Sequence, residues 1–306
     1  MLLATNLPTE QLVFYLHFCY NRAMNEIVEK AAAKINLGLD VVARREDGFH
    51  DLAMVMVNVD LSDYITVTGR EDDQIALECL AGKIPLNGKN HVYKAVQALR
   101  QHTGVKAGVS IKIEKNIPVS AGMAGGSSDA AATLRALNQL WDLNLSLEEL
   151  AQIGLSVGSD VPYCVHGGCA YVTGRGEHVE PLISAPKKWL VIVKPHLGVS
   201  TGTVFKEVDI DTITHVDVPG IRAAIEKGDY EGMLASMGNS LEDITIARRP
   251  EIQKIKNCLQ SAGADIALMS GSGPSVFALC KSEKVANRVM NSARGFCKEV
   301  YKVRML

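Results

Sequence analysis

The most informative stretch of the chain reads Pro118-Val-Ser-Ala-Gly-Met-Ala-Gly-Gly-Ser-Ser128. Residues 109–114 before it alternate between apolar and polar types, which is typical of a half-buried strand. After it, apolar residues recur every three or four positions from Ala130 to Trp141. This order predicts a strand, a glycine-rich loop and a helix that begins one residue after Asp129.

The loop has the composition of a phosphate-binding site. Glycine lets a backbone turn tightly and approach a ligand closely, and the free N–H groups at the start of a helix attract anions. Ser127 and Ser128 add two hydroxyls that can bond a phosphate or its Mg²⁺. The alternative is a plain helix cap, but three glycines between residues 122 and 126 are more than a cap needs.

Two familiar phosphate motifs are absent from this loop. It lacks the Gly-Lys-Ser/Thr ending of a Walker loop and the Gly-x-Gly-x-x-Gly of a dinucleotide-binding fold. We therefore predict a nucleotide loop of another kind. Its predicted binding residues are Pro118, Val119, Ser120, Ala121, Gly122, Met123, Ala124, Gly125, Gly126, Ser127 and Ser128.

Upstream of the loop, the chain predicts a strand hairpin. Residues 35–41 alternate with period two, which would place Lys34, Asn36, Gly38 and Asp40 together on the face opposite the core. Asp47-Gly48 is a strong turn signal, and a second β-rich run follows at residues 49–59.

The remaining elements mix helices and strands. We expect helices at 147–155 (with Ser146 and Glu149 as a capping box), 219–227, 230–237 and 251–262, a loop at 156–162, and strands near 169–173 and at 189–193, 265–269 and 275–280. The last two strands enclose a second glycine turn, Ser270-Gly-Ser-Gly-Pro274, which suits either an ordinary turn or a segment closing over a triphosphate. The mixed order predicts two α+β domains, with Pro181 and Pro186 bracketing the boundary.

The composition is that of a globular protein. Of 306 residues, 47% are hydrophobic and 22% charged, which argues against disorder and against a small disulfide-bonded scaffold. With 32 basic and 34 acidic residues, the formal charge of −2 gives no general attraction to nucleic acid or to an anionic membrane. The seven cysteines lack zinc-site spacing, and no apolar stretch reaches the ~20 residues of a membrane span. We therefore expect reduced thiols and a cytoplasmic location.

Residues 1–23 stand apart from the rest. Their apolar run, residues 12–20, is followed by Arg22, whereas a secretory signal carries its positive charge in front. The segment suits an upstream start, an added segment or an accessory helix, and Met24 directly precedes the first patterned strand. We expect residues 1–23 to lie outside the fold, with an N-terminal domain over 24–185 and a C-terminal domain over 186–306.

Lys34 and Asp160 are ambiguous when each is taken alone. Lys34 lies at the start of a strand, after three alanines that leave room for a neighbouring group. Asp160 lies in Gly158-Ser-Asp-Val-Pro162. A strand-end lysine often serves only as a surface charge, and an aspartate in such a turn often bonds only its own backbone.

Taken in order, four segments resemble the motifs of the GHMP small-molecule kinases, which include galactokinase, homoserine kinase and mevalonate kinase. The segments are Ala33-Lys-Ile-Asn36, the 118–128 loop, Gly158-Ser-Asp-Val-Pro162 and Ser270-Gly-Ser-Gly-Pro274. Three segments add a resemblance to the branch that phosphorylates 4-diphosphocytidyl-2-C-methyl-D-erythritol in the non-mevalonate isoprenoid pathway: Ala33-Lys-Ile-Asn-Leu37, Asp47-Gly-Phe-His50 and Gly158-Ser-Asp-Val-Pro162. The resemblance runs from about Met24 to the C-terminus.

The resemblance implies a fold and a reaction. The fold would have an N-terminal domain of the ribosomal S5 domain 2-like type and a ferredoxin-like C-terminal domain, with the active site between them. The reaction would move the γ-phosphoryl group of ATP, with Mg²⁺, to the 2-hydroxyl of the cytidyl substrate. The partner would be this small molecule, with neither nucleic acid nor membrane involved.

The resemblance also implies residue roles. Asp160 would be the general base, Lys34 its electrostatic partner, and the 118–128 loop the triphosphate site. A lysine in that place would stabilise the negative charge that develops in the transition state. Asn36, Phe49 and His50 match positions that contact the cytidyl substrate, and no protein ligand of the metal is predicted.

Two departures from the family pattern are small. Phe49 stands where tyrosine is common, and Ser120-Ala121 replaces a Gly-Gly pair of some relatives. One alternative is a GHMP kinase for another small alcohol, such as homoserine, mevalonate or a sugar, and the segment Gly48-Phe-His50 argues against it. A second is a non-catalytic nucleotide-binding relative, which would be expected to lack Lys34 or Asp160.

Overall fold

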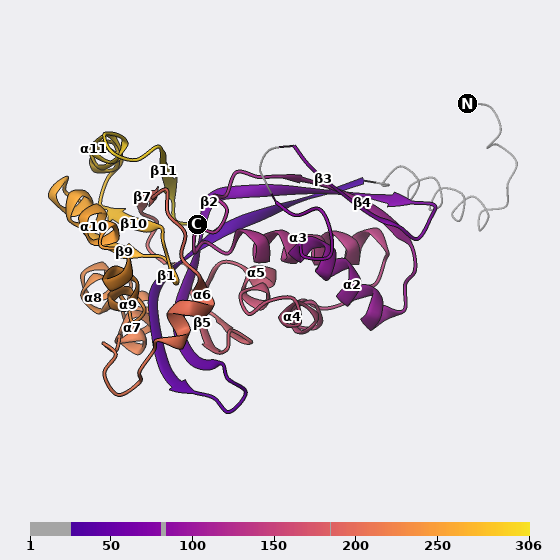
Figure 1. Cartoon of the computed structure of the whole chain (residues 1–306), viewed down its shortest axis with the longest axis horizontal. Coiled ribbons are helices and arrows are strands. Elements are labelled where there is room, and N and C mark those ends of the chain that lie inside the picture. The colour runs from indigo at the N-terminus through magenta and orange to yellow at the C-terminus, as the bar shows by residue number, and fades with distance from the viewer. Residues whose placement is uncertain (1–25, 81–83, 184) are drawn as a thin grey trace, which may run out of the picture.

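The computed structural model describes residues 26–80, 84–183 and 185–306. The prediction for residues 1–23 lies outside these described residues. Figure 1 shows a long sheet with helices against one of its faces and a second sheet at one end. The arrangement is α+β, as the sequence predicts.

Two long antiparallel strands form the centre of the larger sheet. They are β1 (Glu26–Arg44) and β2 (His50–Arg70), joined by the predicted turn, in which Gly48 has a φ of +83°. The strand order is β3-β4-β2-β1-β8, and β5 pairs with both β2 and β6. The shorter strands are β3 (Ile75–Cys79), β4 (Gly108–Glu114), β5 (Cys169–Gly174), β6 (His178–Pro181) and β8 (Gly238–Asn239).

A bulge in β1 overturns one prediction about that strand. The register with β2 shifts between Asn36 and Gly38, and a bulge reverses the faces to which later side chains point. Lys34 and Leu39 therefore line the same pocket, whereas Gly38 faces Ile221 on the other side. The prediction that Lys34, Asn36, Gly38 and Asp40 share one face was wrong, because simple alternation assumes an unbroken register.

Four helices pack beneath the large sheet (Figure 1): α2 (His91–Thr103), α3 (Gly125–Leu140), α4 (Leu147–Leu155) and α5 (Val161–His166). The predicted helix at 147–155 and its capping box are confirmed. The predicted start of α3 at Ala130 was wrong, because the helix already begins at Gly125. The predicted loop at 156–162 also ends early, since Pro162 lies in the first turn of α5, where proline is tolerated.

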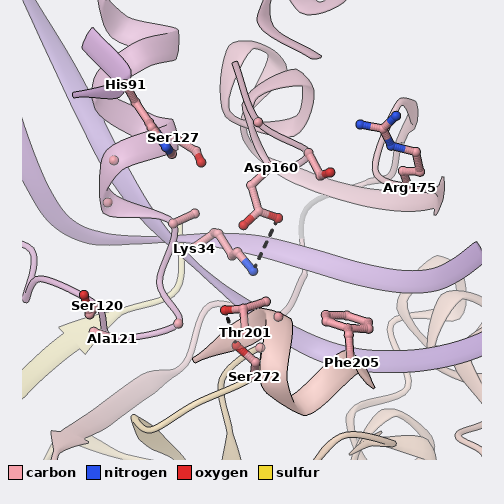
Figure 2. Close-up of a pocket in the computed structure, with 18 of the residues that line it drawn as sticks. Lys34, His91, Ser120, Ala121, Ser127, Asp160, Arg175, Thr201, Phe205 and Ser272 are labelled. Atoms are coloured by element: carbon pink, nitrogen blue, oxygen red, sulfur yellow. Dashed lines mark hydrogen bonds and ion pairs between the residues drawn. The ribbon is translucent and has the colours of Figure 1, made fainter. Parts of the chain in front are cut away.

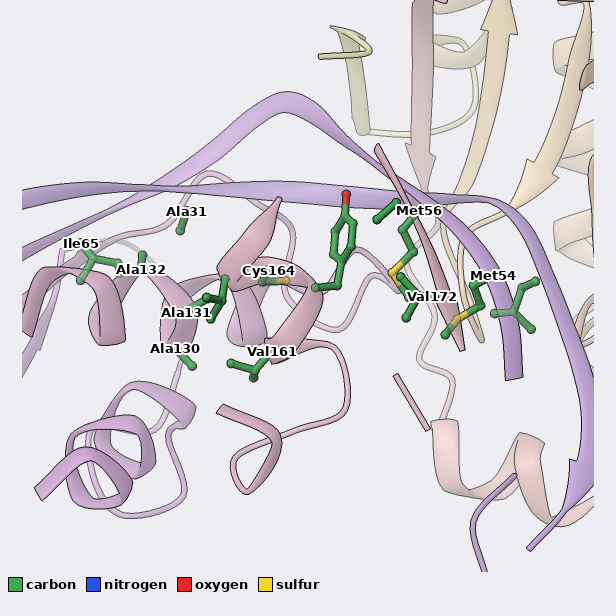
Figure 3. Packing of buried hydrophobic residues seen from close by; sticks show 14 of the residues in the cluster. Ala31, Met54, Met56, Ile65, Ala130, Ala131, Ala132, Val161, Cys164 and Val172 are labelled. Carbon is green, nitrogen blue, oxygen red and sulfur yellow. The ribbon is translucent and has the colours of Figure 1, made fainter. Parts of the chain in front are cut away.

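Small residues bring α3 close to β1. Ala31 on the strand and Ala130, Ala131 and Ala132 on the helix belong to one buried cluster (Figure 3). At this close approach the Ser128 hydroxyl donates a 2.6 Å hydrogen bond to the Ala32 carbonyl oxygen. The start of α3 is thereby fixed against the strand that carries Lys34.

The second sheet is ferredoxin-like. Its strands β7 (Trp189–Lys194), β9 (Ile266–Met269), β10 (Val276–Cys280) and β11 (Glu299–Arg304) are antiparallel in the order β11-β7-β10-β9. Helices follow β7, and a single helix joins β10 to β11, which is the ferredoxin-like succession. The helices are α6 (Thr201–Lys206), α7 (Val218–Lys227), α8 (Tyr230–Ser236), α9 (Glu242–Arg248), α10 (Glu251–Ser261) and α11 (Glu283–Arg294).

The two sheets share apolar core. Ile35 and Leu37 of β1 lie in the same buried cluster as Ile192 and Phe277 of the second sheet. Strand β8, from the second half of the chain, pairs with β1. Among the described helices, none combines the length and apolarity needed to span a bilayer.

Candidate active site

A pocket of about 890 Å³ lies where the two halves of the chain meet. It is lined by β1, the turn after β1, the 118–128 loop, the turn before α5, helix α6 and the second glycine turn. Lys34, Phe49, His50 and Asp160 are among the lining residues. From the loop, all predicted residues line the pocket except Met123 and Ser128.

Lys34 and Asp160 face each other across the pocket (Figure 2). Lys34 Nζ lies 3.8 Å from Asp160 Oδ1, although the two residues come from β1 and from the turn before α5. The Lys34 side chain is only 4% exposed and that of Asp160 is 37% exposed. Asp160 occupies the N-cap position of α5, yet its carboxylate makes no capping hydrogen bond. The carboxylate is therefore available for chemistry rather than used by its own turn.

Asn36 acts on the pocket through Lys34. It does not line the pocket, but its Oδ1 accepts a 2.8 Å hydrogen bond from Lys34 Nζ. The backbone N–H of Lys34 donates to the Met123 carbonyl oxygen, 3.2 Å away. Lys34 is thus held at both ends, and its backbone is tied directly to the glycine-rich loop.

The loop presents unpaired backbone donors to the pocket. The first backbone hydrogen bond at the start of α3 runs from Ser128 N to the Ala124 carbonyl, and no side chain caps the helix. The N–H groups of Gly125, Gly126 and Ser127 make no hydrogen bond to a described residue. At the start of a helix of 16 residues, donors of this kind are able to bind phosphate oxygens.

A buried ionic cluster lies directly against the end of the 118–128 loop. Lys115 Nζ bonds Asp63 and lies 2.7 Å from Asp129 Oδ2, while Asp63 also accepts from the backbone N–H groups of Asn116 and Ile117. Burial raises the pKa of Asp129 to about 7, against the opposing effect of Lys115. Lys115 and Asp129 also line the pocket, so the cluster contributes charge there.

The second glycine turn packs directly on the first loop. Ser270 Oγ donates a 2.9 Å hydrogen bond to the Gly122 carbonyl oxygen, and Gly271 and Ser272 line the pocket. Asn239 Nδ2 bonds the carbonyl oxygens of Met269 and Gly271 and so fixes the turn. The sequence left open whether this segment is an ordinary turn or closes over a triphosphate, and its position at the pocket favours a role in ligand binding.

Aromatic side chains gather at the other end of the pocket. Phe49 is 48% exposed, and the Arg175 guanidinium carbon lies 4.0 Å from the centre of its ring. The His50 and Phe205 rings have centres 5.4 Å apart. Burial, and to a lesser extent Arg44, lower the pKa of His50. In Figure 2, Lys34 and Asp160 lie between the helix starts that carry His91 and Ser127 on one side and Arg175 and Phe205 on the other.

Comparison with known proteins identifies the family. Residues 90–168 match the model of the GHMP kinases N terminal domain, and residues 221–299 match that of the GHMP kinases C terminal domain. A Streptococcus mutans protein provisionally named 4-diphosphocytidyl-2-C-methyl-D-erythritol kinase is 58% identical over 281 residues, covering 92% of this chain and 100% of its own. The chain belongs to the GHMP kinases.

Solved structures agree with this assignment. The crystal structure of a 4-(cytidine 5'-diphospho)-2C-methyl-D-erythritol kinase matches this GHMP kinase with a TM-score of 0.76 and 31% identity, covering 91% of this chain and 99% of that one. Homoserine kinase from Cytophaga hutchinsonii matches with a TM-score of 0.74 at 20% identity, covering 91% and 94% of the two chains. The second match shows the fold alone. The chain is therefore a small-molecule kinase with the two-domain GHMP fold.

Among the pocket-lining residues of this GHMP kinase that sequence reasoning missed are His91, Arg175 and Phe205. His91 begins α2, whose apolar residues Val92, Ala95, Val96 and Leu99 carry a helical period that was open to detection. Phe205 and Arg175 had no such signal, because nothing local marks a side chain of α6 or of the β5–β6 turn as part of a distant pocket. The described part of this kinase holds no group of three or more His, Cys, Asp or Glu side chains placed to bind a metal ion.

Proposed function

We propose that this GHMP kinase transfers the γ-phosphoryl group of ATP to the 2-hydroxyl of 4-diphosphocytidyl-2-C-methyl-D-erythritol. The observation that carries the proposal is the 3.8 Å approach of Lys34 and Asp160, between the uncapped start of α3 and a group of aromatic side chains. The names of the relatives with 58% and 31% identity support the choice of acceptor. A cytoplasmic location would suit the buried thiols of Cys164 and Cys280, which form no disulfide.

The start of α3 would bind the triphosphate. Its unpaired N–H groups supply donors, and the helix dipole favours negative charge at the same point. Ser127 lines the pocket and adds a hydroxyl, whereas the Ser128 hydroxyl is used in its bond to Ala32. Ser127 is therefore the better of the two candidates for a phosphate contact.

Asp160 would take the proton of the acceptor hydroxyl as that oxygen attacks phosphorus. Lys34 would stabilise the charge that develops on the transferring group, and its bond to Asn36 would hold the ammonium in place. Phosphoryl transfer depends mainly on positioning and charge neutralisation, which two fixed side chains of opposite charge can provide.

Mg²⁺ would enter with the nucleotide. With no cluster of metal ligands among the described residues, phosphate oxygens and water would supply most of its coordination, as is common for this ion. Asp160 and Ser127, which both line the pocket, are the residues placed to add a ligand. The ion would neutralise phosphate charge during transfer.

A substrate panel tests the proposed acceptor. ATP consumption would be measured with the cytidyl substrate and, separately, with homoserine, mevalonate and galactose. We expect turnover with the cytidyl substrate only. Turnover with one of the other alcohols would show that the protein is a kinase with a different acceptor from the one proposed. Binding of ATP without turnover of any of the four compounds would favour a non-catalytic relative.

Replacing Phe49 with alanine should raise KM for the cytidyl substrate. Base–aromatic stacking contributes about 1–3 kcal/mol, so we expect an increase of roughly 5- to 150-fold with little change in KM for ATP. Phe296→Ala is the matched control, because Phe296 is 51% exposed and lies outside the pocket. If ATP affinity fell instead, Phe49 would belong to the adenine site and the two ligands would be reversed.

ATP binding should take up protons through His91. Burial and Lys94 lower the pKa of His91 below its usual value of 6.5, while Asp160 opposes them, so the imidazole is largely neutral at pH 7. Its Nδ1 is buried without a hydrogen bond and lies 3.3 Å from the Cβ that Gly126 would carry. A triphosphate beside it would raise this pKa, because negative charge favours the imidazolium form.

Calorimetry of ATP binding near pH 6.5, in buffers of different ionisation enthalpy, would measure this uptake. Asp129, with its pKa of about 7, can also bind a proton, so the comparison is between variants. His91→Gln should reduce the uptake, and His102→Gln, on the exposed end of the same helix, should not. Equal uptake in the parent and in His91→Gln would exclude His91 from the triphosphate site.

A further inference from the structure

Arg175 lines the pocket with a guanidinium that stacks on an aromatic ring but forms no ion pair with a described residue. It lies in the turn between β5 and β6, and its Nε atom is buried without a hydrogen bond. Among the described residues, none accepts a hydrogen bond from the guanidinium or forms an ion pair with it. The nearby carboxylate of Asp47 is hydrogen-bonded to the backbone N–H of Phe49 and to Arg45, which lower its pKa, and the charge of Arg175 adds to this effect without a direct ion pair.

The fold holds Arg175 in place through a ring contact and through the position of its turn. Its guanidinium stacks on the Phe49 ring, 4.0 Å from the ring centre. The next residue, Gly176, has a φ of +120°, and a Cβ there would lie 2.4 Å from the Ser159 carbonyl oxygen. The β5–β6 turn is therefore pressed against the segment that carries Asp160. Arg175 is only partly buried, but its Nε is buried without a hydrogen bond, so an anionic ligand could bind guanidinium donors that the protein leaves unused.

Position decides which anion fits. The triphosphate site at the start of α3 lies on the far side of Lys34 and Asp160 from Arg175 (Figure 2). Arg175 instead lies on the side of Phe49 and Phe205, where the acceptor would bind. One face of the Phe49 ring carries the guanidinium, so a pyrimidine would stack on the other. The planar donor fork of arginine matches the oxygens of a phosphate.

We propose that Arg175 binds the diphosphate of the acceptor substrate and so selects acceptors that carry a nucleoside diphosphate. This inference rests on the proposed function, because it requires an acceptor of that class. It adds a specificity residue that neither Phe49 nor His50 can replace, since both present rings rather than cationic donors to the pocket. Arg175 acts by binding and takes no part in the proton transfer.

Cytidine, CMP and CDP form a ligand series that isolates this contact. Their affinities would be measured by calorimetry for the parent, Arg175→Gln, Arg175→Lys and a control, Arg294→Gln, whose arginine is exposed on α11 outside the pocket. In Arg175→Gln we expect CDP binding to weaken by about 10- to 100-fold and cytidine binding by less than about threefold. The CDP affinity of Arg175→Lys should lie between those of the parent and Arg175→Gln, because lysine keeps the positive charge but lacks the planar set of donors of arginine. Thermal midpoints of all variants would confirm that each is folded.

The other outcomes overturn the inference in distinguishable ways. Equal weakening of cytidine and CDP would show that Arg175 only positions Phe49. Weaker ATP binding with unchanged CDP binding would move Arg175 to the triphosphate. Failure of the parent protein to bind any of the three ligands, together with no turnover of the cytidyl substrate, would overturn both this inference and the proposed function.

Discussion

Replacing Asp160 with asparagine should lower kcat by about 10²- to 10⁴-fold, the range typical of a positioned general base. The change is nearly isosteric, and the carboxylate makes no hydrogen bond that the fold needs, so the protein should remain folded. Steady-state kinetics and a thermal midpoint would check both statements. Asp211→Asn is the control, because Asp211 is exposed and lies outside the pocket.

Replacing Lys34 should show that Lys34 and Asp160 act as a unit in catalysis. Lys34→Met removes the ammonium 3.8 Å from Asp160 and also the donor to Asn36. Groups that act together lose activity non-additively, so the double variant should be little slower than the slower single variant. Activity of Asp160→Asn within about threefold of the parent would remove Asp160 from the catalytic role, since that is far below a general-base effect.

Replacing Gly122 with alanine should have the largest effect on stability. Gly122 has a φ of +71°, and a Cβ there would lie 2.2 Å from the Ser270 carbonyl oxygen and 3.1 Å from that of Gly273. Both contacts are backbone atoms, so one of the two glycine loops must move. Strain at positive φ and overpacking together should cost about 2–5 kcal/mol of unfolding free energy and should weaken ATP binding.

Gly104→Ala is the matched control for this variant. Gly104 has a similar φ of +78°, but no atom lies within 4 Å of the Cβ it would carry. It should therefore lose only the conformational part, about 1–2 kcal/mol. Urea unfolding would compare the two variants. The same loss in both would mean that the contact between the glycine loops does not constrain Gly122.

Local interactions explain the elements that could be predicted from sequence. The helix at 147–155 carries its own start signal, because Ser146 and Glu149 bond each other's backbone N–H groups within one turn. The turn at Asp47-Gly48 likewise needs only its own residues and the free φ of Gly48. The start of α3 could not be placed this way, because Gly125 to Asp129 are helical in backbone but add nothing to the apolar period.

By itself, the sequence determined the family, the mixed α+β order and the glycine-rich loop at 118–128, since motif composition and short-range periodicity are properties of neighbouring residues. The resemblance to the family also pointed to Lys34 and Asp160 as candidate catalytic residues. Only the tertiary structure decided how these parts meet. The bulge after Asn36 sends Gly38 and Asp40 away from the pocket, and Ser270 reaches Gly122 across the two halves of the chain. The pairing of Phe49 with Arg175 likewise joins two separate turns. Such contacts follow from packing between elements far apart in the chain, where no local pattern records the neighbour.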